Sequence, residues 1–207
     1  MITEEMLSAL RSDIEKRMLP KRFHHTVEVE KMAARLGELY VPEKTMTLRA
    51  AALLHDITKE YPTDRHMLLC AVRGLEVTKE DTCAPKTFHA RTAAAIIPDA
   101  YPEFDDAEII SAVRWHTTGR ADMTVCEKLV YLADYIDMSR TFEDCVKLRE
   151  YFFSADLEKM GPEKRLEHLN DTLILSFDMT IRGLMEDGTV ISRDTFEARN
   201  FLIAEKR

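Results

Sequence analysis

The sequence predicts an all-α protein formed by a single domain. Apolar residues recur at helical spacing along almost the whole chain, and we find no convincing pair of strands. Six glycines and seven prolines among 207 residues are few, and a hydrophobic content of 45% suits a compact, helix-rich chain rather than a disordered one. A chain of this length is also large enough to bury a substantial core.

Prolines mark the ends of the helices in the first half of the chain. Pro20, Pro42, Pro62 and Pro98 each stand just beyond one helical pattern, where proline stops a helix. The helices expected in this half cover about residues 3–18, 23–40, 45–57, 64–72 and 86–97.

The second half continues the helical pattern to the C-terminus. Gly119 marks a turn between two helices, and Asp187-Gly188 ends a long one whose apolar stripe runs from Leu166 to Leu184. Thr195 is expected to cap the last helix. The other helices expected here cover about residues 105–117, 124–139 and 162–186. We therefore predict one domain over residues 1–207, with its core at about 18–140 and the helices of 162–206 completing the bundle.

Composition excludes several classes of protein. A formal charge of −8 gives no basis for sequence-independent nucleic-acid binding, which needs a basic surface. No apolar run approaches the ~18 residues of a membrane span, and the N-terminus lacks the apolar core of a signal peptide. The four cysteines are scattered without metal-binding spacing, so we expect reduced thiols in a cytoplasmic protein.

Four histidines and two aspartates stand on or beside apolar helical stripes: His25, His55, His89, His116, Asp56 and Asp134. A buried charge without a partner costs several kcal/mol, on the order of 3–5. Each histidine alone could be a satisfied core residue, but a bound metal ion would explain the whole set at once. His24, His66 and His168 are expected at the surface, with His24 near enough to support the site.

The order of these residues resembles a known signature. His25, the pair His55-Asp56, and Asp134 on successive helices are similar to the H…HD…D pattern of HD-domain phosphohydrolases. The surrounding blocks occur in the matching order and together resemble the YqeK-type family of bacterial symmetrical diadenosine tetraphosphate hydrolases. Those blocks cover residues 22–26, 53–59, 88–90, 115–120 and 127–136, with a weaker similarity at 194–196 and Asn200.

This resemblance implies a helical HD-domain bundle that binds iron and cleaves diadenosine tetraphosphate into two ADP. Position by position, the iron ligands correspond to His25, His55, Asp56 and Asp134. The residues expected to bind the nucleotide are Arg22, Asp56, Ile57, Thr58, Lys59, His89, His116, Thr117, Asp134 and Arg140, with Thr195, Phe196, Glu197, Ala198, Arg199 and Asn200 in a C-terminal stretch that completes the pocket. The chain departs from the family where Ile57 replaces a tyrosine and where Asp137-Met138 replaces a glutamate-proline pair.

The chemistry of these residues suits phosphoanhydride hydrolysis. A bound metal lowers the pKa of its water to near ~7, and Asp56, Lys59 and His116 are the expected catalytic residues. We expect one iron ion; His89 and His116 would contact phosphate, protonate the departing ADP oxygen or hold a second ion, and we favour phosphate contact. Alternative functions are another HD-type nucleotide or cyclic-nucleotide phosphohydrolase, or a non-catalytic nucleotide sensor. The expected partner is a small nucleotide, not nucleic acid or membrane, and a homodimer is left open.

Overall fold

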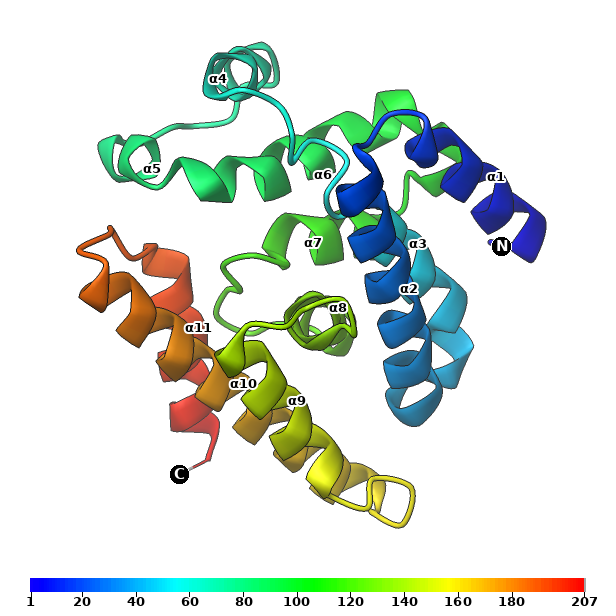
Figure 1. Ribbon diagram of the computed structural model, residues 1–207, viewed down its shortest axis with the longest axis vertical. Coiled ribbons are helices and arrows are strands. Elements are labelled where there is room, and N and C mark those ends of the chain that lie inside the picture. The colour runs from blue at the N-terminus through cyan, green and yellow to red at the C-terminus, as the bar shows by residue number, and fades with distance from the viewer. Residues whose placement is uncertain (207) are drawn as a thin grey trace.

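The computed structural model describes residues 1–206, and this part of the chain contains helices but no strand. The prediction of an all-α fold is therefore confirmed (Figure 1). The elements are α1 (Glu4–Glu15), α2 (Pro20–Tyr40), η1 (Pro42–Lys44), α3 (Thr45–Leu54), α4 (Thr63–Val72), α5 (Lys79–Cys83), η2 (Pro85–Thr87), α6 (Phe88–Ala100), η3 (Pro102–Phe104), α7 (Ala107–Trp115), α8 (Val125–Ile136), α9 (Glu143–Ser154), α10 (Pro162–Glu186) and α11 (Arg193–Glu205).

Helix α8 lies at the centre of the molecule, seen nearly end-on in Figure 1. It packs against α2, α3, α7, α9 and α10, and every residue from Cys126 to Ala133 is buried. A capping box fixes where α8 begins: the Thr124 hydroxyl accepts from the Glu127 N–H at 3.2 Å, and the Glu127 carboxylate accepts from the Thr124 N–H at 2.8 Å. Such a helix holds a residue near its end, Asp134, in a fixed place.

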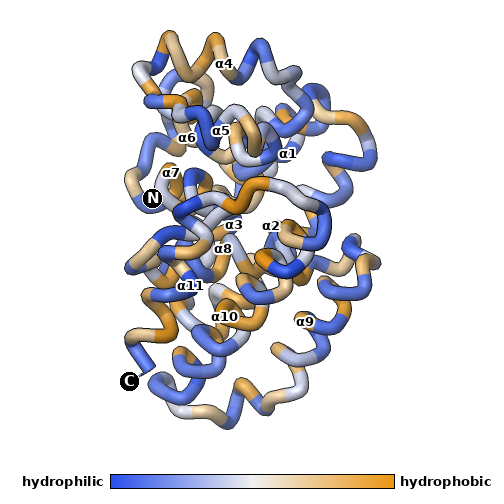
Figure 2. The backbone as a smooth tube through the Cα atoms, turned by 90° about the vertical axis from the view of Figure 1, so that its left-hand side faces the viewer, coloured by the Kyte–Doolittle hydropathy of each residue, from blue (hydrophilic) through white to orange (hydrophobic). Residues whose placement is uncertain are grey.

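One hydrophobic core includes buried residues of helices from α1 to α11, from Leu7 to Leu202. Figure 2 shows hydrophobic and hydrophilic residues alternating along most of the helices, which is the pattern of amphipathic helices. In the described part of the chain, no helix is long and apolar enough to cross a membrane.

Several helix boundaries differ from the prediction. Helix α3 ends at Leu54 rather than near Ile57, because residues 55–60 form turns in which N–H groups bond three residues back, as from Lys59 to the Asp56 carbonyl at 3.0 Å. Helix α2 begins at Pro20, since the first turn of a helix needs no donor from proline. Helix α6 continues through Pro98 to Ala100 instead of stopping before the proline.

The sequence did not predict helices α5 and α9, and the residue predicted to cap the last helix was wrong. Helices α5 and α9 have short or charge-interrupted apolar patterns, although α9 buries Cys145, Leu148 and Phe152. Thr195 does not cap the last helix: Ser192 occupies the N-cap position, and Thr195 lies buried inside α11.

The three histidines expected at the surface behave differently from one another. His24 is exposed, as expected, and His168 is half-buried, with Nε2 at 3.0 Å from the Phe152 carbonyl oxygen. The prediction for His66 is wrong, because this ring is 5% exposed and lies 2.9 Å from the Thr92 hydroxyl. The charged residues that precede His66 in the sequence suggested an exposed position, although this face of the short helix α4 is buried.

Candidate metal and phosphate site

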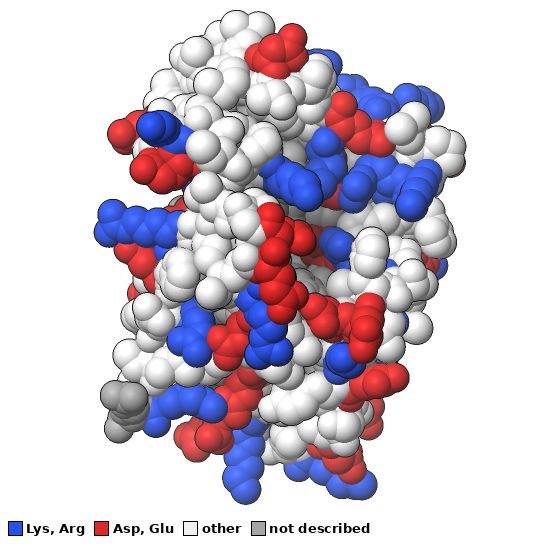
Figure 3. Space-filling view, turned by 60° about the vertical axis from the view of Figure 1, so that its left-hand side comes forward, with Lys and Arg blue, Asp and Glu red and all other residues white. Residues whose placement is uncertain are grey.

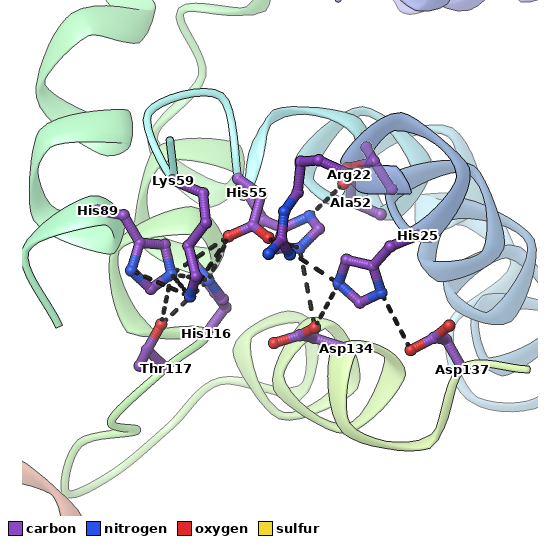
Figure 4. A network of polar contacts seen from close by, with 12 residues as sticks. Arg22, His25, Ala52, His55, Lys59, His89, His116, Thr117, Asp134 and Asp137 are labelled. Carbon is purple, nitrogen blue, oxygen red and sulfur yellow. Dashed lines mark hydrogen bonds and ion pairs between the residues drawn. The ribbon is translucent and has the colours of Figure 1, made fainter. Parts of the chain in front are cut away.

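Most of the predicted site residues lie together beside α8, at or near the ends of the helices that supply them (Figure 4). The turn after α3 presents one histidine and one aspartate, and three other helices and one helix terminus supply the rest. From α2 come Arg22 and His25, from the α3 turn His55, Asp56 and Lys59, from α6 His89, from the end of α7 His116 and Thr117, and from α8 Asp134.

Four side chains form what we call the metal cluster: His25, His55, Asp56 and Asp134. The His25 Nε2 atom lies 3.0 Å from Asp134 Oδ1 and 3.9 Å from Asp56 Oδ2. The His55 Nε2 atom lies 3.4 Å from Asp56 Oδ2 and 3.8 Å from Asp134 Oδ1. Ligands that share one ion at bonds of ~2.1 Å are separated by about 3–4 Å, so each of these four histidine–aspartate distances suits a shared metal ion.

Both histidines of the metal cluster are oriented through their second ring nitrogen. The His55 Nδ1–H donates to the Ala52 carbonyl at 2.6 Å, and His25 Nδ1 lies 3.3 Å from Asp137 Oδ2 and 3.2 Å from the Ser139 hydroxyl. These contacts orient both rings so that Nε2 faces the other members of the metal cluster.

The metal cluster also contains unsatisfied buried atoms. Within residues 1–206, His25 Nε2, His55 Nε2 and Asp56 Oδ1 are buried and have no hydrogen bond of good geometry. Buried polar atoms normally have partners, and those that do not call for an ion or a ligand. The donor set of two imidazoles and two carboxylates therefore fits a divalent metal ion.

A second group, which we call the phosphate cluster, consists of Lys59, His89, His116 and Thr117. The two histidine Nε2 atoms are 3.0 Å apart, and the Thr117 hydroxyl lies 3.1 Å from that of His89 and 3.0 Å from that of His116. The Lys59 ammonium is 3.1 Å from His89 Nε2. Each ring directs its Nδ1–H at a backbone carbonyl 2.7 Å away, so both Nε2 lone pairs face the same space.

Asp56 joins the two clusters, because its two oxygens face different groups. Oδ2 faces the metal cluster, whereas Oδ1 lies 3.2 Å from His89 Nε2 and 3.8 Å from His116 Nε2. Two sets of donor atoms have mutual distances within 4.8 Å, one formed by His25, His55 and Asp134 and the other by His55, Asp56 and His116. Asp56 is thus the residue on which the whole site depends.

Charge is distributed unequally over the site. Burial opposes ionisation of both aspartates, but His55 and the other imidazoles hold the pKa of Asp56 well below its usual range, and Arg140 does the same for Asp134. Burial alone would lower the pKa of His25, yet the Asp134 and Asp137 carboxylates beside its ring raise that pKa to about 9. The metal cluster is therefore an anionic centre that attracts a cation.

Burial has the opposite outcome in the phosphate cluster. It lowers the pKa of His89 well below its usual value and also lowers that of His116. Both rings are neutral at neutral pH and can accept hydrogen bonds through Nε2.

Two arginines approach the aspartates from the solvent side. Arg22 pairs with Asp56 Oδ2 at 2.6 Å, and Arg140 pairs with Asp134 Oδ1 at 2.5 Å. Each guanidinium is 28% exposed, while the Asp56 side chain is 3% exposed. A ligand that enters the site must therefore pass these two cations and Lys59.

Two residues expected to bind the nucleotide face the protein interior instead. Thr58 is fully buried, and its hydroxyl donates to the His89 carbonyl at 2.9 Å. The same carbonyl and Thr92 connect it to His66, so this buried chain positions the start of α6. Ile57 packs against the hydrophobic core. Thr58 thus supports the position of His89, and contact of Thr58 or Ile57 with a nucleotide stays a prediction.

The C-terminal stretch 195–200 lies beside the site rather than in it. Within the described chain, no hydrogen bond or ion pair joins this stretch to either cluster. It approaches the site through Gly119, two residues after Thr117: a Cβ added to Gly119, whose φ is +66°, would lie 3.1 Å from the Ala198 Cβ. The other members are distributed around this contact: Thr195 is buried, Phe196, Glu197 and Asn200 are exposed, and Arg199 pairs with Asp178.

Asp137 is the site residue that the sequence did not reveal. It is completely buried, its Oδ2 contacts His25, and its Oδ1 accepts from the Ser139 N–H at 2.8 Å. The only signal was its position three residues after Asp134, at a point where the chain departs from the pattern of similar proteins. Its role is to hold the imidazole of His25 in place.

Comparison with known families agrees with this geometry. The profile described as "HD domain" matches residues 22–139, which contain both clusters. The chain is also similar to a solved structure described as a predicted HD superfamily hydrolase involved in NAD metabolism from Clostridium acetobutylicum. The TM-score is 0.84 at 28% identity, and the match covers 99% of this chain and 100% of that one.

Characterised relatives are similar over most of their length. A Bacillus subtilis protein named symmetrical bis(5'-nucleosyl)-tetraphosphatase is 28% identical over 191 residues, which cover 92% of this chain and 94% of that protein. A Staphylococcus aureus protein of the same name is 33% identical over 141 residues, which cover 67% of this chain and 71% of that protein.

Proposed function

Because this chain belongs to the HD-domain family and, within it, to the symmetrical bis(5'-nucleosyl)-tetraphosphatase type of hydrolase, we propose that it cleaves diadenosine tetraphosphate into two ADP with iron as its metal. The single observation that carries this proposal is the convergence of unsatisfied donor atoms in the metal cluster beside a group of phosphate-binding side chains. Mixed imidazole and carboxylate donors suit iron as well as zinc and manganese.

The metal cluster would hold this ion through His25, His55, Asp56 and Asp134, and the ion would supply an acidified water and polarise a phosphate oxygen. Asp56 has a second task, because its Oδ1 atom is a buried acceptor without a hydrogen bond within residues 1–206. That oxygen can accept a hydrogen from the attacking water and so orient it toward the central phosphorus.

The phosphate cluster would receive the charge that develops on the phosphoryl group. The Lys59 ammonium and the Thr117 hydroxyl are donors that point into the space between the two histidines (Figure 4). Polyphosphate beside His89 and His116 favours their protonated forms, since a neighbouring negative charge raises an imidazole pKa. Either ring can then donate a proton to the departing ADP oxygen, and we assign this role to His116.

The charge that binds the substrate is local. On the face of the molecule shown in Figure 3, basic and acidic side chains are interspersed, in keeping with a net charge of −8. Arg22, Lys59 and Arg140 nevertheless gather around the two clusters. Local cations at the mouth of a site attract a polyanion even when the protein as a whole is acidic.

Product identification tests the proposal. We expect iron-loaded protein to convert diadenosine tetraphosphate into ADP alone, with two ADP formed for each substrate and one water consumed. Asp56→Asn should form none, and Asp64→Asn, which changes an exposed acidic residue on α4, should behave like the wild type. Formation of AMP and ATP, or an untouched substrate, would overturn the proposal.

A further inference from the structure

A cavity opens next to the metal cluster, on the side of α2 and the start of α9. Its volume is about 470 Å³, within the range that holds a small-molecule ligand. The metal-cluster residue His25 lines it, together with Arg22 and Arg140, the two arginines that pair with the aspartates of the site. The remaining wall includes Leu19 and Phe142.

Two large apolar side chains on this wall face solvent. Leu19 is 65% exposed and Phe142 is 71% exposed, at the start of α2 and at the N-cap position of α9. Neither side chain belongs to the hydrophobic core. Exposed apolar groups that rim a polar cavity are typical of a ligand-binding surface.

The cavity is lined by charges of both signs. Arg22 and Arg140 line it and pair with the aspartates of the site, and Lys21 adds a third cation. The carboxylate of Glu60, which accepts from the Leu19 N–H at 2.9 Å, also lines it. A carboxylate repels phosphate but accepts hydrogen bonds from ribose hydroxyls or from an amino group. An aromatic ring provides a face for a base. Phosphate beside the arginines and nucleoside toward Glu60 and Phe142 is the arrangement that these charges favour.

Symmetrical cleavage requires such a second compartment. The bond that breaks is at the centre of the tetraphosphate chain, so two nucleoside diphosphates must extend from the reacting phosphorus in different directions. In Figure 4, Lys59, His89 and Thr117 lie on one side of the site and His25 lies on the other. The cavity is on the His25 side, since His25 lines it. On the Thr117 side, Gly119 lies close to Ala198 in the stretch 195–200, where one nucleoside is expected. The cavity beside His25 is then the place for the other half of the substrate.

We infer that this cavity binds the second nucleoside of the dinucleotide, with its base stacked on Phe142 and its phosphates between Arg22 and Arg140. The inference rests on the proposed function, because it concerns the same reaction. Phe142 is then a specificity-determining residue: it selects substrates that carry a nucleoside at both ends. A base stacked on an aromatic side chain is typically bound ~5- to 150-fold more tightly than without it.

The test measures binding without turnover. Metal-loaded protein is titrated calorimetrically with a diadenosine tetraphosphate in which methylene replaces the central bridging oxygen, and with an adenosine 5'-tetraphosphate that carries the same methylene bridge but lacks the second nucleoside. We expect the wild type to bind the dinucleotide about tenfold more tightly, Phe142→Ala to lose this preference, and Phe142→Trp to keep it. Leu68→Ala removes another exposed apolar side chain, on α4, and should keep it as well.

The outcomes separate the inference from the proposed function. Equal affinity of the wild type for the two ligands, or an unchanged preference in Phe142→Ala, would overturn the second-nucleoside site. Because Phe142 is exposed, its truncation should leave the thermal unfolding midpoint unchanged, and a melting curve checks this. Failure of the proposed function would appear instead as a wild type that releases no ADP from the natural dinucleotide, whatever the binding preference.

Discussion

The metal cluster and the phosphate cluster both contain two histidines next to Asp56, but the Nε2 atoms of these histidines have different partners in the two clusters. In each, two histidines direct Nδ1 at a fixed acceptor and present Nε2 to a shared space, and Asp56 supplies one oxygen. The metal cluster adds a second carboxylate and leaves two Nε2 atoms without hydrogen bonds in the described chain. The phosphate cluster adds a hydroxyl within hydrogen-bond distance of both Nε2 atoms and an ammonium within that distance of the His89 Nε2 atom.

This difference teaches what each pair of histidines is suited to bind. An anionic centre with open lone pairs attracts a cation, whereas neutral rings beside a donor hydroxyl and an ammonium suit an anion. Figure 4 shows the two arrangements side by side, with His89, His116 and Thr117 on one side and His25 and Asp134 on the other. We therefore interpret one pair as metal ligands and the other as phosphate contacts.

Asp56→Asn should have the largest effect, because it weakens both clusters at once. An amide cannot supply the same anionic ligand, so the ion and its activated water are lost together. We expect ADP release to fall by more than the ~10²–10³-fold that a single stabilising donor contributes. Elemental analysis and steady-state rates check this, and a variant that keeps its metal content with near-normal turnover would contradict the central position of Asp56.

His116→Gln should affect the phosphate cluster alone. Loss of a proton donor to the departing oxygen typically lowers the rate by ~10²–10⁴-fold, and we expect kcat to fall within that range. The His116 side chain is completely buried, so a thermal melt must first show that the variant folds. A rise in KM with unchanged kcat would reassign the ring from proton transfer to ground-state binding.

Asp137→Asn should weaken the metal cluster without touching a ligand. The carboxylate of Asp137 orients His25, and loss of such a partner typically lowers metal affinity ~10- to 100-fold. Competition with a chromophoric chelator measures this affinity. Phosphate binding should not change, and an equal loss of both would show that the substitution disturbs the fold.

The pH dependence of metal binding should reveal the state of His25. Its pKa is raised to about 9 from an ordinary 6.5, so metal must displace a proton at neutral pH. Metal affinity should rise by up to about tenfold per pH unit toward pH 9 and level off above it.

The same shift makes the stability of the metal-free protein depend on pH. Because the folded-state pKa of His25 is the higher one, its contribution to the free energy of unfolding is fully present below pH 6.5 and is lost as pH rises through about 9. Chemical denaturation at several pH values tests the sign. Rising stability of the metal-free protein over this interval would contradict it.

Helical periodicity predicted that His25, His55 and Asp134 face the core, but it predicted the same for His89 and His116. The resemblance to HD-domain phosphohydrolases, not periodicity, separated the metal cluster from the other histidines. Asp56 was predicted because it is adjacent to His55 in the sequence. Periodicity also predicted the all-α fold, since it spans most of the chain.

What the sequence could not supply depends on turns and on contacts between distant segments. The turn at 55–60 aims Asp56 at both clusters, and no helical pattern encodes it. Asp137 follows the last residue of α8, outside any stripe, and reaches His25 only because α2 and α8 pack together. His66 meets Thr92 through packing of α4 on α6. In helix α9, charged residues interrupt the apolar positions, and the helix is too short for its pattern to be distinguished from a charged loop.

The metal content of the wild type and of a His89→Gln, His116→Gln double variant tests the division of labour most directly. Both proteins are purified with iron available, confirmed to be folded, and analysed for metal per chain. The account predicts one ion per chain in each, because the metal cluster is complete without the phosphate cluster. Two ions in the wild type and one in the variant would contradict it, and would make His89 and His116 metal ligands.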